Sequence, residues 1–371
     1  MLNILRRFFR RNDPLVLGCA VALSAFSVLL LMGIQQMGVI GRRTVIMQII
    51  AAALGLLLAL GLAHLDYERL GGWWKFYVPA AVALMLLTFT PLGQTRSDAI
   101  ETNRSWLNLG FTTIQPAEFL KIAFILSLAY HLSRTEGRLG ENKTLIRVAL
   151  HAIFPVLLIL LQKDWGVAAV MLFIVVAMVI MAGLPRRWIV MGAAAAVVFI
   201  PLAWFFLLDD YQKIRFTLLK NPEAYALGAA YQQLQGRISF GSGQMFGIGI
   251  FSGEHRYVPD MYNDMIFTFI GESVGFIGAL GVLVVYIILL VRILQIGIRS
   301  SNRMGRCITV GVFTMLASQI IINVAMCLLV GPSVGVTLPL LSAGGSSVLS
   351  AYLGLGLVLS VGHAEKPTMF S

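Results

Sequence analysis

The stretch PLVLGCAVALSAFSVLLLMGIQQMGVIG (residues 14–41) contains no charged residue. A helix needs about 20 mainly apolar residues to cross the hydrocarbon core of a bilayer. This run is long enough to do so, and we expect it to be a membrane-spanning helix.

Comparable runs recur along the whole chain. Charge-free or nearly charge-free stretches cover residues 44–65, 76–95, 148–162, 165–185, 188–208 and 273–291. Residues 307–364 are too long for one span, and the proline- and glycine-containing stretch 331–345 divides them into two helices with a re-entrant connection. A last span, at about residues 116–132, contains Glu118 and Lys121. The pattern predicts an all-α polytopic membrane protein with about ten transmembrane helices.

The composition excludes an ordinary soluble protein. Hydrophobic residues make up 58% of the 371 residues and charged residues 12%, whereas a typical soluble domain carries about 25% charged residues. The net charge is 28 − 17 = +11, but the basic residues lie mostly in short gaps between apolar runs. That arrangement sets membrane topology and does not indicate a nucleic-acid groove, so we expect membrane lipid as a partner and no nucleic acid.

The distribution of basic residues also predicts the orientation. An even number of spans places both termini on one side, and most of the loop arginines and lysines fall on that side. The positive-inside rule makes this side cytoplasmic. Residues 209–264 then form a long extracellular loop before the eighth helix, and residues 91–115 form a shorter one. We treat residues 1–371 as a single transmembrane domain.

Ionisable residues within or beside these spans are costly in a bilayer and need an explanation. Glu118 and Lys121 lie three residues apart, on one helix face and within reach of each other. They form an internal ion pair, contribute to substrate binding, or do both. Asp164 stands where the sixth span begins, so it either caps that helix or faces an external cavity.

The region PDMYNDMIFTFIGES (residues 259–273) contains three further carboxylates, Asp260, Asp264 and Glu272. Asp264 ends the long loop, where it is a helix N-cap or a general base held at the membrane surface. Glu272 lies two turns further along, either as a buried hydrogen-bonded carboxyl or as a second polar group of a site.

The remaining motifs carry weaker signals. Ser346 and Ser347 open the last span and form a phosphate nest or a tight turn. The glycine-rich stretch 241–250 lacks the GK[ST] of a Walker loop. We expect His255, in the long loop, to be solvated. The three cysteines lie in or beside apolar runs without metal-ligand spacing and are expected to be buried thiols.

Several stretches together resemble the SEDS family of bacterial membrane proteins, which includes RodA, FtsW and SpoVE. They are NDPLVLG, SWLNLG, QPAEFLKIA, QKDWG, DDYQKIRFTLLKNPEAYALGAAYQ, GRISFGSGQMFGIGI, VPDMYNDMIF, GESVGFIGALGVL and GVTLPLLSAGGSS. Their order and spacing make the resemblance specific. The NPEAYALGAAYQ stretch is more similar to RodA than to FtsW.

The resemblance implies a peptidoglycan glycosyltransferase in the bacterial cytoplasmic membrane. Such an enzyme polymerises lipid II on the outer face of that membrane, for elongation or division, in complex with a class B penicillin-binding protein. The family's catalytic aspartate matches Asp264, its buried Glu/Lys pair matches Glu118 and Lys121, and the aspartate of its QPDLG-type motif matches Asp164. Arg104 and Trp106 match its basic-x-Trp motif in the first external loop.

The sequence also departs from the family pattern. Asp260, Tyr262 and Asn263 replace the glutamate, histidine and threonine of PExHTDFIF. Ala343 replaces the tyrosine of SYGGS, and Lys163 replaces the proline of QPDLG. The key carboxylates remain, whereas the details of substrate and partner are open.

The resulting hypothesis is a single displacement with Asp264 as general base. Undecaprenyl-pyrophosphate-linked glycan is the donor, and the 4-hydroxyl of lipid II is the acceptor. The leaving pyrophosphate needs a partner, for which the candidates are Arg104, Lys121, the Ser346/Ser347 nest and a divalent metal such as Mg or Mn. Two alternatives stay open: a flippase for a lipid-linked precursor, and a non-catalytic scaffold for a penicillin-binding protein.

Overall fold

The computed structural model describes residues 13–94, 104–108, 110, 112–135, 137–206, 208–228 and 230–364. Within these residues, the ten predicted spans all fall on helices. The helices are α2 (Pro14–Gln36), α3 (Arg42–Ala63), α5 (Trp74–Leu87), α6 (Pro116–Ser133), α7 (Asn142–Leu161), α8 (Trp165–Met181), α9 (Arg186–Phe206), α12 (Ile266–Arg299), α13 (Arg303–Cys327) and α14 (Gly345–Ala364). Seven of them are long and apolar enough to cross a membrane, and α5 and α8 are shorter apolar helices. The predicted polytopic helical fold is confirmed, while the number of crossings stays a prediction.

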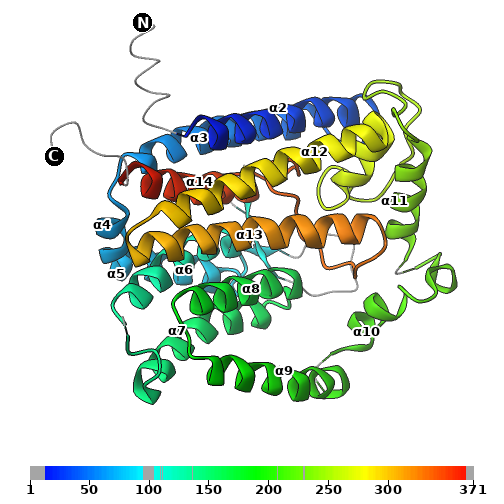
Figure 1. Ribbon diagram of the computed structural model, residues 1–371. Helices are drawn as coiled ribbons and strands as arrows, with labels where there is room; N and C mark the ends of the chain where they lie inside the picture. Colours follow the sequence, from blue (N-terminus) through cyan, green and yellow to red (C-terminus); the bar gives the residue numbers. More distant parts are fainter. Residues whose placement is uncertain are drawn as a thin grey trace, which may run out of the picture.

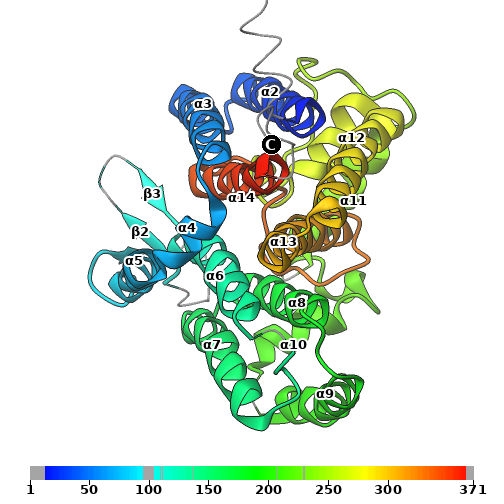
Figure 2. The same ribbon diagram turned by 60° about the vertical axis from the view of Figure 1, so that its left-hand side comes forward.

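Helix α14 lies at the centre of the bundle, surrounded by α2, α3, α6, α12 and α13 (Figure 2). Its small residues allow neighbouring backbones to come close. A Cβ atom added at Gly356 would lie 2.8 Å from the Cα atom of Ala59, and one at Gly55 would lie 2.6 Å from the ring of Tyr352. Small residues at helix contacts are typical of membrane proteins, because packing rather than the hydrophobic effect holds the helices together in lipid.

The start of α2 and the end of α14 lie at the same end of the bundle (Figure 1). Asp13, which caps α2, forms an ion pair of 2.7 Å with Arg292 near the end of α12. Ser360, near the end of α14, donates a hydrogen bond to the carbonyl oxygen of Leu65 after α3. Helix α4 (Tyr67–Gly72) also lies at this end. The expectation that both ends of the membrane domain share a side is confirmed. That this side is cytoplasmic stays a prediction of the positive-inside rule.

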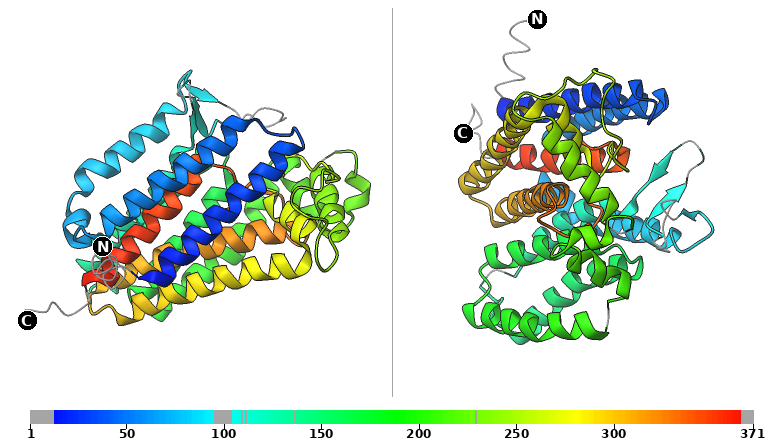
Figure 3. Two further views of the ribbon diagram at one scale, coloured as in Figure 1. Left: turned by 90° about the horizontal axis from the view of Figure 1, so that it is seen from above. Right: turned by 90° about the vertical axis from the view of Figure 1, so that its right-hand side faces the viewer.

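The opposite end, called the outer end below, carries the two segments that the sequence predicts to be extracellular (Figure 3). The first contains a small antiparallel sheet of β1 (Gly93–Gln94), β2 (Trp106–Asn108) and β3 (Thr113–Ile114). The second contains α10 (Asp210–Thr217), a 3₁₀ helix (Pro222–Tyr225) and α11 (Tyr231–Ser242). The segment predicted as a long loop thus contains three short helices among its described residues.

The connection between α13 and α14 is non-helical, as the prolines and glycines predict. Several of its apolar side chains are buried inside the bundle, namely Val336, Leu338, Leu340 and Leu341. Irregular backbone at membrane depth is tolerated where it is buried in protein. This connection therefore crosses the protein interior and brings residues 331–344 against the other segments of the outer end.

Helix α9 differs from the rest because none of its residues is buried. Figure 2 shows it apart from the central helices, at the edge of the bundle. Its apolar residues therefore face the surroundings on all sides, which suits a helix in contact with lipid.

Helix α12 is broken near its outer end. Gly275 has φ 71° and ψ −175°, a backbone conformation outside the helical region that is essentially restricted to glycine. A Cβ atom there would lie 2.5 Å from the carbonyl carbon of Met245. Both the torsion angles and the close approach require glycine.

We predict that Gly275→Ala lowers the thermal stability of the purified protein, by about 1–3 kcal/mol for the strained backbone. Gly281→Ala is the matched control, because Gly281 lies in the same helix and a Cβ atom there meets nothing within 4 Å. The measurement is the unfolding temperature of both variants in detergent. Equal unfolding temperatures would show that the break does not need a glycine.

Candidate functional site

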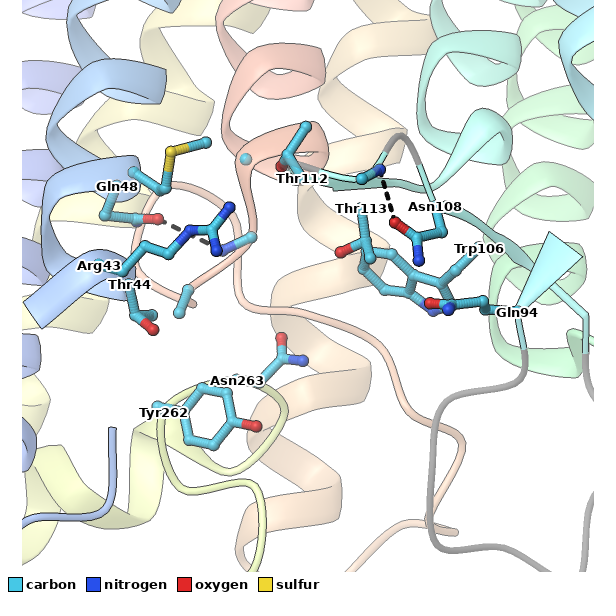
Figure 4. Close-up of a pocket in the computed structure, with 15 residues that line it drawn as sticks. Arg43, Thr44, Gln48, Gln94, Trp106, Asn108, Thr112, Thr113, Tyr262 and Asn263 are labelled. Carbon is cyan, nitrogen blue, oxygen red and sulfur yellow. Dashed lines mark hydrogen bonds between the residues drawn. The ribbon is translucent and has the colours of Figure 1, made fainter. Parts of the chain in front are cut away.

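A cavity of about 530 Å³ opens at the outer end of the bundle (Figure 4). Four segments line it: the start of α3, the small sheet, the segment before α12 and the segment before α14. Their lining residues are Arg43, Thr44, Met47 and Gln48; Gln94, Trp106, Asn108, Gly110, Thr112 and Thr113; Tyr262 and Asn263; and Ala343, Gly344 and Gly345. The tertiary fold therefore creates the cavity from parts that are distant in sequence.

The chemistry of the lining is polar, and Arg43 is the cationic side chain among its described residues. Amide side chains include those of Gln48 and Asn108, and the Trp106 ring adds a flat apolar surface. Figure 4 shows these groups around a common space. Such a lining suits a ligand that carries hydroxyl groups and a negative charge.

Asp264 directly follows the lining residues Tyr262 and Asn263 but is not itself among the lining residues. It is 5% exposed. Its Oδ2 atom lies against the backbone of Gly335, because a Cβ atom added there would be 3.4 Å away. The carboxylate is thus placed where the segment before α12 meets the α13–α14 connection. Helix α12 has Met265 as its N-cap, so Asp264 precedes the cap position.

Hydrogen bonds from buried side chains fix this junction. The Asn323 amide donates to the carbonyl oxygens of Asp264 and Val336, at 2.7 Å each. The Ser342 hydroxyl donates to the carbonyl oxygen of Asn263 at 2.6 Å, and the Ala343 amide donates to that of Tyr262 at 2.8 Å. The position of the Asp264 backbone is therefore defined by these contacts.

The predicted pair of Glu118 and Lys121 is present on α6. The Lys121 Nζ atom lies 2.7 Å from Glu118 Oε1, and the two side chains are 0% and 3% exposed. The Ser350 hydroxyl donates to the other carboxylate oxygen. Ser350 is five residues along α14 from Gly345, so the pair lies about 7.5 Å deeper than the cavity floor. It links α6 to α14 beneath the cavity.

Asp164 caps α8, which confirms one of its two sequence interpretations. Its Oδ1 atom accepts a hydrogen bond from the Val167 amide at 3.1 Å, and its Oδ2 atom accepts one from the Gln115 side chain at 3.0 Å. Burial raises the pKa of Asp164 from 3.8 to about 6, although the hydrogen bond from Val167 opposes the shift. The carboxylate therefore holds the start of α6 against the start of α8.

Glu272 is a buried hydrogen-bonded carboxyl, the first of the two interpretations. It accepts from the amide of Arg256 at 3.0 Å and from the Ser242 hydroxyl at 3.2 Å. His255 Nδ1 lies 3.2 Å from its Oε2 atom. The expectation that His255 is solvated is wrong, because its side chain is 0% exposed. Glu272 faces away from the cavity described above and lines a separate space of about 360 Å³.

The other predicted residues divide between the cavity and the interior. Trp106 lines the cavity, whereas Arg104 is exposed and is not part of the lining. The hydroxyls of Ser346 and Ser347 have protein partners, the Gln115 amide and the Thr337 hydroxyl. Both serines are buried, so the backbone of the preceding residues lines the cavity in their place.

Sequence reasoning missed most of the residues that line the cavity, including Arg43 and Gln48. Arg43 was counted only as a loop charge that sets topology. Gln48 lies within an apolar run. A polar amide at such a position could have marked it as a candidate site residue. It donates to the carbonyl oxygen of Ser342 at 3.1 Å and accepts from the Gly344 amide at 3.3 Å, so it positions the segment before α14.

Comparisons with known sequences agree on one family. The family model for the cell cycle proteins FtsW, RodA and SpoVE matches residues 11–367. The chain is 32% identical over 355 residues to the peptidoglycan glycosyltransferase MrdB of Escherichia coli (strain K12), which covers 94% of this chain and 93% of MrdB. It is 30% identical over 324 residues to stage V sporulation protein E of Bacillus subtilis (strain 168), covering 86% and 87%.

Comparisons with solved structures agree with these results. One similar chain comes from work on the coordination of polymerization and crosslinking by a peptidoglycan synthase complex. Its TM-score is 0.79 at 30% identity, with 95% of this chain and 98% of that chain covered. The rod shape determining protein RodA of Thermus thermophilus gives a TM-score of 0.68 at 27% identity, covering 96% and 98%.

We predict that removing one partner of the Glu118–Lys121 pair destabilises the protein more than removing both. Lys121→Met leaves a buried carboxylate uncompensated, which costs about 3–5 kcal/mol. The double variant Glu118→Gln/Lys121→Met leaves no buried charge and should unfold at a higher temperature than Lys121→Met. The measurement is thermal unfolding of the single and double variants in detergent. A double variant that is less stable than Lys121→Met would contradict this interpretation.

Proposed function

Since the chain belongs to the FtsW/RodA/SpoVE family, we propose that it polymerises lipid II into glycan strands, with Asp264 as the general base. It is a peptidoglycan glycosyltransferase with several membrane spans. The reaction takes place on the outer face of the bacterial cytoplasmic membrane, in line with the positive-inside orientation. The single observation that carries the proposal is the fixed junction that holds Asp264 beside the polar cavity of the outer end.

The reaction that we infer is a single displacement. The 4-hydroxyl oxygen of the acceptor's terminal N-acetylglucosamine forms a bond to the anomeric carbon of the donor. The bond from that carbon to the pyrophosphate oxygen breaks, and undecaprenyl pyrophosphate leaves. The hydroxyl proton passes to the Asp264 carboxylate. A positioned base of this kind contributes about 10²–10⁴-fold to the rate.

Asp264 is the one carboxylate that we assign to the site, and a single carboxylate supports inversion at the anomeric carbon. A retaining reaction would need a second carboxylate as nucleophile about 5 Å from the first. Glu272, the other candidate of this region, is held by His255 and Arg256 away from the cavity. Asp264 therefore acts as a base in this proposal and forms no covalent intermediate.

Arg43 is the cation that we assign to the pyrophosphate. It lines the cavity, and its planar guanidinium can bind two oxygens of one phosphate group. Lys121 is a weaker candidate, because it is buried in an ion pair beneath the cavity. Gln48 and the backbone next to Gly344 provide the neighbouring polar groups.

A divalent metal was a candidate partner for the leaving pyrophosphate, but the described residues form no protein site for it. They contain no cluster of three or more histidine, cysteine, aspartate or glutamate side chains that could hold an ion. Among the described residues that line the cavity, none is a carboxylate. We therefore derive no catalytic step through a resident metal ion.

We also propose a class B penicillin-binding protein as the partner. The support is the similarity to a chain of a peptidoglycan synthase complex in which polymerization and crosslinking are coordinated. A polymerase that releases strands next to a crosslinking enzyme would supply that enzyme with its substrate directly. A flippase or a non-catalytic scaffold remains as the competing interpretation, and the first experiment below distinguishes them.

We predict that Asp264→Asn lowers polymerisation of lipid II by about 10²–10⁴-fold, since the amide cannot accept the hydroxyl proton. Asp210→Asn is the matched control, because Asp210 is an exposed carboxylate of the same extracellular segment. The readout is glycan chain length on a gel, with the purified protein and its partner. Chains of equal length from both variants would exclude Asp264 as the base. If wild type makes no chains while a known polymerase does, the flippase or scaffold interpretation is favoured.

Arg43 and Arg42 offer a second matched pair, because both are exposed but only Arg43 lines the cavity. We predict that Arg43→Ala lowers kcat/KM by about 10²-fold, the typical effect of losing one charge-stabilising group. Arg42→Ala should stay close to wild type. The measurement is the initial rate of polymerisation against lipid II concentration. Equal losses in the two variants would mean that the effect is a general charge effect at the membrane surface.

A further inference from the structure

The glycine-rich segment 243–251, GQMFGIGIF, has no part in the proposed catalysis, yet it is held firmly against the break in α12. Four backbone hydrogen bonds of 2.8–3.2 Å join the two segments: from Ile248 to Glu272, from Gly249 to Ser273, from Phe276 to Gln244 and from Ile277 to Met245. The first two are donated by the glycine-rich segment and the last two by α12. The break in α12 and this segment satisfy each other's backbone groups.

Two glycines make this close approach possible. Gly247 has φ 78°, and a Cβ atom there would lie 2.5 Å from the carbonyl carbon of Ser273. On the other side, Gly33 of α2 makes room for the chain, because a Cβ atom there would lie 2.5 Å from the carbonyl oxygen of Ile250. Segment 243–251 is therefore packed between the outer ends of two membrane helices.

Its depth follows from the lengths of these helices. Gly33 lies three residues before the end of α2 at Gln36, which is about 4.5 Å at 1.5 Å per residue. Arg292, which pairs with Asp13, marks the cytoplasmic side of α12. Ile277 is 15 residues from Arg292, or about 22 Å along the helix. Since the hydrocarbon core is about 30 Å thick, segment 243–251 reaches into its outer part.

The side chains of this segment suit that depth. Residues 243–251 contain no charged residue. Met245, Phe246, Ile248 and Phe251 are 53%, 80%, 39% and 51% exposed. Large apolar side chains that project from a firmly held backbone mark a surface that something apolar covers.

We propose that residues 243–251 form a wedge that is inserted between the acyl chains of the outer leaflet. Non-helical backbone is stable at this depth only when its polar groups are paired within the protein, and the α12 break provides that pairing. The apolar side chains then contact the acyl chains, so their apolar surface is not exposed to water. This inference goes beyond the proposed function and does not depend on the chemistry of Asp264.

The wedge also gives the segment that carries Asp264 a fixed depth. The carbonyl oxygen of Ile250 lies 3.2 Å from His255 Nε2, and His255 Nδ1 contacts Glu272. The Arg256 amide donates to the same carboxylate. From there only seven residues separate Arg256 from Asp264. Insertion of the wedge would therefore set the height of Asp264 relative to the membrane surface, where a lipid-linked substrate presents its pyrophosphate.

The test measures depth with a nitroxide spin label at Phe246→Cys, in vesicles of phosphatidylethanolamine and phosphatidylglycerol. Glu254→Cys is the matched control, since Glu254 is exposed in the polar part of the same loop. Cys19, which is half-buried, is replaced by alanine, and the labelled parent gives the background from Cys307 and Cys327. An unfolding temperature equal to that of the unlabelled protein shows that each labelled variant is folded. The readout is the collision rate of the label with oxygen, which concentrates in lipid, and with a water-soluble nickel chelate.

We expect the label at position 246 to collide more with oxygen than with the nickel chelate, and the label at position 254 to show the reverse. The same preference for the nickel chelate at both positions would overturn the proposal, because the segment would then lie in water. Low collision rates with both reagents at position 246 would also overturn it. They would show that a protein surface, such as the membrane helix of a partner or a second copy of this chain, covers the wedge.

Discussion

Polar groups inside a membrane protein must find their partners within the protein, and the connection between α13 and α14 shows how far this constraint reaches. Its carbonyl groups pair with side chains from several helices: Leu341 with Ser27, Ser342 with Gln48, Val336 with Asn323 and Pro339 with Tyr286. Water could satisfy an irregular segment at a protein surface, but lipid cannot. The helices must therefore surround this connection in one arrangement, and that arrangement builds the outer end of the molecule.

The same constraint makes the proposed site rigid. Asn323 holds the backbone of Asp264 and that of Val336 with one amide group, so two loops move together or not at all. The Glu118–Lys121 pair, closed by Ser350, supports the start of α14 from below. A general base must stay within hydrogen-bond reach of its substrate. Buried polar contacts provide this precision here, whereas a solvated loop of the same length would not.

Much of this could be predicted from the sequence, and the exceptions have physical reasons. Apolar runs predict spanning helices because each segment in lipid must pair its own backbone groups, whatever its neighbours are. An aspartate directly before such a run predicts a helix cap, as at Asp164. The small sheet was not predicted, since its strands are only two or three residues long and carry no clear alternation. His255 was misjudged because the carboxylate that buries it, Glu272, lies 17 residues away on another element.

The sequence by itself determined the class of the protein and its helices, and it predicts the orientation and the candidate carboxylates. These features depend on length, hydropathy and local spacing, which are properties of each segment taken by itself. Only the tertiary structure decided that Arg43, Trp106 and Asn263 share one cavity and that Glu272 does not belong to it. Which side chains meet depends on how the helices pack and where the α13–α14 connection crosses between them. Helix packing in lipid is governed by close contacts between small residues, such as Gly55 and Gly356, and by paired polar groups, and neither has a local signature in the sequence.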